Sequence, residues 1–122
     1  MRMNPLEEFL DCFEPLRQEW VEVEGCIVRG HRARLKRREV KRALNSGMNR
    51  EEVEKNFNHC HMSMELEQFG LKNSKGLRKR ITELFVAVVD HRLRKEFAGN
   101  EFIFEIWHEA DDTIVTYYQK RK

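Results

Sequence analysis

The chain has 122 residues, of which 40% are apolar and 36% are charged, and its formal net charge is +2. This length suits a single domain spanning residues 1–122, and the apolar content excludes an intrinsically disordered chain. The sequence lacks the run of about 18 apolar residues that a membrane span needs. Its N-terminus is unlike a signal peptide, and the three cysteines lack paired spacing. We therefore expect a cytoplasmic protein with free thiols and no membrane partner.

The charge is divided unevenly along the chain. Residues 1–25 contain two basic and seven acidic residues, a net of −5, whereas residues 29–42 contain eight basic residues and one acid, a net of +7. The basic segment predicts a partner that is either nucleic acid, DNA or RNA, or an acidic protein surface.

The first predicted element is an amphipathic helix over residues 5–19, bent or ended near Pro15. Its apolar residues follow a three- and four-residue spacing, and its other face is acidic through Glu7, Glu8, Asp11 and Glu14. Residues 21–28 alternate and then become apolar across Gly25. They predict either one strand with a bulge or two short strands that turn at Gly25.

Residues 32–44 predict a basic helix that ends at Gly47. Ala33, Val40, Ala43 and Leu44 gather on one narrow arc of this helix. At 100° per residue the basic side chains fill the adjoining arc of about 140°. These are Arg34, Arg37, Arg38, Lys41 and Arg42. Several cations on one exposed face are what phosphate binding requires, and guanidinium groups suit phosphate well. Alternatively the arc is a solvated surface or is covered by the acidic N-terminal helix.

A capping box at Asn49–Glu52, preceded by Met48 as a hydrophobic staple to Val53, predicts a second helix to about Asn58. His59, Cys60 and His61 then break the pattern, and residues 62–69 predict a short helix. The stretch from Val40 to Gly70 resembles the helix-turn-helix of DNA-binding proteins, which implies a recognition helix at residues 62–68. It departs from that family at Glu54, where a small residue is expected, and the implied recognition helix carries Glu65 and Glu67 but no cation.

Residues 77–97 predict a long helix that forms the core, capped by Asn73 or Ser74. Leu77, Ile81, Leu84 and Val88 make its main apolar stripe. Residues 102–108 and 113–119 then predict a β-hairpin around residues 110–112. Trp107, Tyr117 and Tyr118 are candidates for an aromatic surface, although most of them are expected in the core. Residues 120–122 predict a basic tail.

No pattern for a catalytic, cofactor or metal site emerges. His59, Cys60 and His61, with Cys26 or His31, are poorly spaced for tetrahedral zinc. Cys60 with His59 or His91 as a nucleophilic pair is equally weak, and His91 is expected to pack beside the core.

We therefore predict an α+β fold, mainly helical, with a long central apolar helix and a C-terminal antiparallel hairpin; the alternative is a winged-helix variant with the hairpin as wing. The expected function is that of a non-enzymatic nucleic-acid-binding regulator that uses the basic helix on phosphates. The alternative is a protein-binding adaptor or inhibitor, of the kind mobile elements encode, that uses the acidic helix or the hairpin aromatics. An RNA-cleaving toxin ranks third because no acid–base set is evident.

Overall fold

The computed structural model describes residues 19–30 and 33–121, so nearly all of the helix predicted at residues 5–19 lies outside the described residues. Along the chain the described elements are two strands, two helices, one strand, two helices and two strands, and their bounds follow in order. They are β1 (Trp20–Val23), β2 (Cys26–Arg29), α2 (Ala33–Asn45), α3 (Arg50–Phe57), β3 (His59–His61), α4 (Met62–Gln68), α5 (Lys75–Glu96), β4 (Phe102–His108) and β5 (Thr113–Gln119). The predicted α+β class with a C-terminal hairpin is confirmed.

Two antiparallel sheets organise the chain: β1 pairs with β2, and β5 lies between β3 and β4. The first sheet confirms two strands in the 21–28 region. Glu24 and Gly25 both have positive φ, 49° and 84°, as a two-residue hairpin turn of type I′ requires. The break in the helix predicted at residues 59–61 is confirmed, and the structure adds that these residues form a strand, which pairs with β5 and extends the C-terminal hairpin by one strand.

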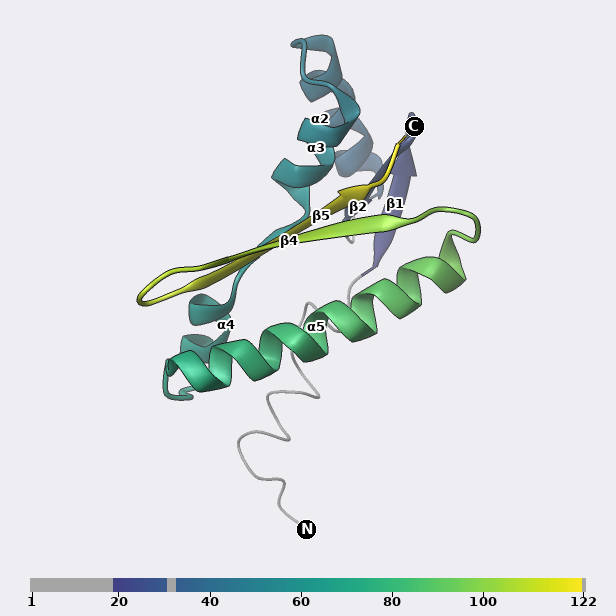
Figure 1. Ribbon diagram of the computed structural model, residues 1–122. Coiled ribbons are helices and arrows are strands. Elements are labelled where there is room, and N and C mark those ends of the chain that lie inside the picture. Colours follow the sequence, from purple (N-terminus) through teal and green to yellow (C-terminus); the bar gives the residue numbers. More distant parts are fainter. Residues whose placement is uncertain (1–18, 31–32, 122) are drawn as a thin grey trace.

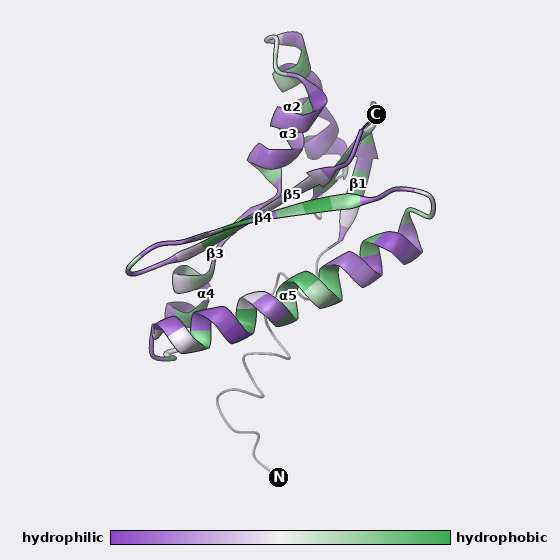
Figure 2. Cartoon of the chain, in the orientation of Figure 1, coloured by the Kyte–Doolittle hydropathy of each residue, from purple (hydrophilic) through white to green (hydrophobic). Residues whose placement is uncertain are grey.

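Helix α5 lies along one face of the three-stranded sheet, which we call the inner face (Figure 1). Its N-cap is Ser74, whose hydroxyl accepts a hydrogen bond from the Leu77 amide. The main core fills the space between α5, α4 and the sheet, where the Phe85 and Tyr117 rings lie 6.3 Å apart. Apolar colour accordingly concentrates on α5 and β4, whereas α2 is largely hydrophilic (Figure 2).

The predicted stripe of α5 is correct only in part. The fully buried line is Ile81, Phe85, Val89 and Leu93. Val88 is only half-buried and Leu84 is 37% exposed. The physical reason is that the sheet covers a single face of this widely apolar helix, and Leu84 and Val88 lie at the margin of that face.

Helices α2 and α3 pack beside each other over a second, smaller core around Val40 and Val53. Gly47, with φ of 103°, ends α2 in a Schellman arrangement, in which the Met48 amide donates to the Ala43 carbonyl. Asn49 and Glu52 then form the predicted capping box of α3. Met48 packs on the same cluster as Val53, as the predicted staple requires.

The helix-turn-helix implied by the resemblance is absent from the described residues. Strand β3 separates α3 from α4 and pairs with β5, α3 packs on β2 and β5, and α4 packs on α5. Glu54, the residue that departs from the helix-turn-helix pattern, is fully buried. Its carboxylate accepts hydrogen bonds from the Ile27 amide at 2.8 Å and the Gln119 amide at 3.0 Å, so it joins α3 to two strands.

Candidate nucleic-acid interface

The five basic residues predicted to bind phosphate all have exposed side chains on α2; we call them the α2 basic arc. They are Arg34, Arg37, Arg38, Lys41 and Arg42. Of the predicted apolar arc, Val40 is fully buried and Ala43 and Leu44 are partly buried, whereas Ala33 is exposed. Packing of this face against α3 and β1 turns the adjoining basic arc toward solvent.

The α2 basic arc has no ion pair with any acid in the described part of the chain. The only acid of α2, Glu39, pairs instead with Lys36 at 3.4 Å. Lys36 also lies over the Phe57 ring, 5.0 Å from its centroid, which holds this cation against α3. Ala33 and four members of the arc line a depression of about 340 Å³. The arc therefore presents several positive charges without an acidic partner in the described part of the chain, around a shallow concave surface.

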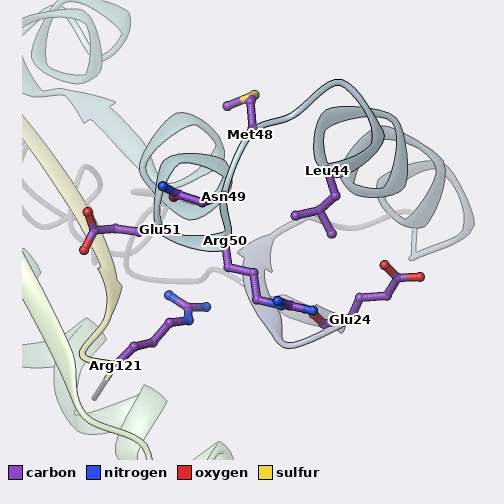
Figure 3. A pocket seen from close by; sticks show the side chains of 7 residues that line it. All are labelled: Glu24, Leu44, Met48, Asn49, Arg50, Glu51 and Arg121. Carbon is purple, nitrogen blue, oxygen red and sulfur yellow. The ribbon is translucent and has the colours of Figure 1, made fainter.

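A second hollow of about 620 Å³ lies where the β1–β2 turn, the start of α3 and the C-terminus meet (Figure 3). Arg50 donates to the Glu24 carbonyl at 2.6 Å, and Arg121 donates to the Glu54 carboxylate at 2.7 Å and the Gly25 carbonyl at 3.0 Å. Both guanidinium groups hold the fold together, and Glu24 and Glu51 oppose their charge at the rim. This hollow is therefore a weaker candidate for binding anions than the α2 basic arc.

Strand β3 separates the three residues that the sequence grouped as possible metal ligands. Cys60 points to the inner face and is 4% exposed, whereas His59 and His61 belong to the opposite, outer face. Burial, together with the nearby Glu65, raises the pKa of the Cys60 thiol to about 12, so it is protonated at neutral pH and unsuited to act as a nucleophile. Cys26 is likewise a buried free thiol. No cluster of three metal-ligating side chains occurs within residues 19–30 and 33–121.

The outer face of the sheet carries a groove of about 520 Å³ that the sequence did not reveal; we call it the histidine groove. It is bounded by α3 on one side and by β3, β4 and β5 beneath. Its lining residues are Met48, Glu52, Lys55, Asn56, His59, His61, Trp107, Ile114 and Thr116. Of the three predicted surface aromatics, only Trp107 is exposed, at 47%, while Tyr117 and Tyr118 are buried. His91, which was expected to pack beside the core, is exposed on α5.

Both groove histidines are held through the same ring nitrogen. His59 Nδ1 lies 2.9 Å from the Asn56 carbonyl oxygen, and His61 Nδ1 lies 2.8 Å from an Asp112 carboxylate oxygen. Carbonyl and carboxylate oxygens accept hydrogen bonds, so each Nδ1 carries the proton. The ring centroids are 5.5 Å apart. Each Nε2 atom therefore remains available to a ligand in the histidine groove.

The β4–β5 turn is tied to α5, which fixes the position of Asp112. Arg78 is buried and donates to the Ala110 carbonyl at 3.1 Å, and Asn73 donates to the Asp111 carbonyl at 2.9 Å. Burial tends to raise the pKa of Asp112. Hydrogen bonds from His61, Ser63 and Thr113 outweigh that effect and hold the pKa of this carboxyl below its usual range.

The lowered pKa of Asp112 predicts that stability falls in acid. The unfolded chain binds a proton at this site more readily than the folded chain, so the contribution is complete above the usual aspartate pKa of about 4 and is lost as pH falls further. At pH 6 we expect the midpoint of urea unfolding to lie at a lower urea concentration for Asp112→Asn than for wild type. The difference between the two midpoints should shrink as the pH falls toward 2.5. Asp111→Asn, beside it in the turn and exposed, is the matched control. A constant gap across this pH range would contradict the prediction.

Within the described residues no helix is both long enough and apolar enough to cross a membrane. Comparison of the chain with protein-family models, with curated proteins and with solved structures gives no match.

Proposed function

We propose that this protein binds nucleic acid through its phosphates, with the α2 basic arc as the contact surface. One observation carries the proposal: five neighbouring cations are exposed on one helix face without an acidic partner among the described residues. Lysine and arginine that neutralise phosphates release condensed counterions, which supplies most of the sequence-independent affinity for nucleic acid. The free buried thiols Cys26 and Cys60 support a reducing compartment, and we place the protein in the cytoplasm.

The test is a triple variant, Arg34→Gln, Arg38→Gln and Lys41→Gln. We expect weaker binding to duplex DNA, single-stranded DNA and structured RNA alike, because phosphate contacts carry no base preference. The plot of log K against log salt has a negative slope, and this slope should become less steep by up to about 0.9 for each lost contact. Fluorescence anisotropy titrations between about 50 and 200 mM salt measure both quantities.

A matched control separates the site from the total charge. Lys75→Gln, Lys79→Gln and Arg80→Gln remove the same charge from exposed positions on α5 and should leave affinity nearly unchanged. Equal losses in both triple variants, or a wild-type chain that binds none of the three nucleic acids, would refute the proposal. If the arc instead holds the acidic N-terminal segment, the first variant melts earlier at low salt and binding is not weakened.

The exposed tip of the hairpin favours a protein-binding adaptor as the second candidate. Trp107 and Ile106 are 47% and 39% exposed on β4. Exposed tryptophan is typical of the centre of a protein interface. This function would be favoured if the wild-type chain binds no nucleic acid and Trp107→Ala abolishes binding to a protein partner.

A further inference from the structure

We infer that His59 and His61 form the general acid–base pair of an RNA-cleaving site in the histidine groove. This activity goes beyond binding, and it rests on the proposed function only in requiring that the chain binds RNA. RNA cleavage was the last of the three functions expected from the sequence, because no acid–base set was evident there. Strand β3 supplies one, since residues two apart on a strand lie on the same face.

The geometry supports a pair of imidazoles that act on one phosphodiester. Their ring centroids are 5.5 Å apart, and each Nδ1 is anchored by an oxygen. Both rings line the same groove, with His59 exposed and the His61 side chain 37% exposed. Two Nε2 atoms are thus presented to one ligand from adjacent positions, as proton transfer to and from two oxygens of the same phosphate requires.

The anchoring oxygens assign the two roles. The Asn56 carbonyl fixes the tautomer of neutral His59 that leaves a lone pair on Nε2, so His59 acts as the base. The Asp112 carboxylate lies 2.8 Å from His61 Nδ1 and places a negative charge beside this ring and not beside His59, so we assign the role of acid to His61. Asp112 is a positioning residue, because it acts through His61.

The reaction is a transfer of the phosphoryl group within RNA. His59 removes the proton of a ribose 2′-hydroxyl, and the oxygen forms a bond to the adjacent phosphorus. The bond from phosphorus to the 5′-oxygen of the next nucleotide breaks, and His61 gives its proton to that oxygen. The products are a 2′,3′-cyclic phosphate and a 5′-hydroxyl. The two histidines exchange protonation states, which water restores, and the step needs no oxidant or reductant.

Other groove residues suit RNA as the ligand. The exposed indole of Trp107 offers a surface on which an unpaired base can stack. The charged groups that face the histidines are Glu52, Lys55 and Asp112, and Lys55 also pairs with Glu51 and Glu105 at 3.6 and 3.5 Å. This mixed charge gives the groove little attraction for phosphate. The α2 basic arc supplies that attraction from the helix packed beside α3, which borders the groove.

The test uses the full chain and a labelled DNA oligonucleotide that contains one ribonucleotide, in the presence of EDTA. Wild type should cut only on the 3′ side of the ribonucleotide, leave a 2′,3′-cyclic phosphate, and leave an all-DNA oligonucleotide intact. His59→Gln and His61→Gln should each lower the rate by about 100-fold or more. His59→Gln should melt at the wild-type temperature, because its side chain is exposed and its anchor is a backbone carbonyl, and both variants should keep most of their affinity for RNA, because the α2 basic arc supplies the attraction for phosphate. His91→Gln, an exposed histidine on α5 purified in the same way, should keep the full rate.

The outcomes separate this inference from the proposed function. Wild type that binds RNA without cutting it overturns the inference and leaves nucleic-acid binding intact. Cleavage that persists in either histidine variant, or that also occurs in all-DNA, overturns it as well. If His61→Gln melts early because Asp112 loses its partner, His59→Gln decides the matter, since its anchor is only a backbone carbonyl. Cleavage that depends on both histidines but not on the α2 basic arc would uphold the inference and refute the arc as the binding surface.

Discussion

Replacing Glu54 by alanine is expected to lower the free energy of unfolding by several kcal/mol, about 1–3 kcal/mol for each buried donor that loses its acceptor. The carboxylate is fully buried and accepts from the Ile27 amide, the Gln119 amide and side chain, and Arg121. Without it, the Ile27 amide loses its acceptor in a buried site and Gln119 loses its acceptors in a partly buried one, whereas Arg121, whose side chain is 32% exposed, can turn to water.

Urea denaturation at pH 7 measures this effect, and two variants test its cause. Glu54→Gln keeps the size of the side chain, but its amide nitrogen donates and cannot accept from the same groups, so it should also be strongly destabilising. Glu51→Ala is the matched control on the same helix: Glu51 is 51% exposed and forms only a surface pair with Lys55, worth less than about 1 kcal/mol. Equal losses for Glu54→Ala and Glu51→Ala would show that the buried carboxylate does not hold α3, β2 and β5 together.

Replacing Val89 by aspartate is expected to abolish cooperative folding, whereas the same change at the neighbouring Val88 should leave a folded protein. Val89 is fully buried between α5 and the sheet, and an unpaired carboxylate there costs as much as the whole stability of a small domain, about 5–15 kcal/mol. Val88 is half-buried, so its carboxylate would reach water, and we expect a loss within about 0.5–3 kcal/mol.

Circular dichroism and urea titrations of the two variants provide the measurement. The pair is well matched because the residue type, the helix and the substitution are the same. A folded Val89→Asp variant, or a Val88→Asp variant that fails to fold, would show that the core lies on a different face of α5.

The sequence by itself determined the elements whose signals are local. The Asn49–Glu52 capping box, the Gly47 C-terminus of α2 and the C-terminal hairpin were all predicted within a residue or two. Each depends on hydrogen bonds or alternation among residues close in the chain, so the information lies in a short segment. The gathering of the α2 basic arc on one face, apart from the buried Val40, follows for the same reason, since helical periodicity alone places these residues there. Periodicity did not decide whether the acidic N-terminal segment covers that face.

Tertiary structure alone decided the features that join distant segments. Residues 59–61 have no strong strand pattern and become β3 only because β5 offers a free edge. Arg121 was expected in a basic tail, yet it binds the buried Glu54 carboxylate from a position 67 residues away. His61 meets Asp112 across 51 residues, which turns two unremarkable surface histidines into an oriented pair. Such contacts depend on how strands and helices pack. Hydrophobic periodicity within one segment does not predict which polar residue of a distant segment will contact it.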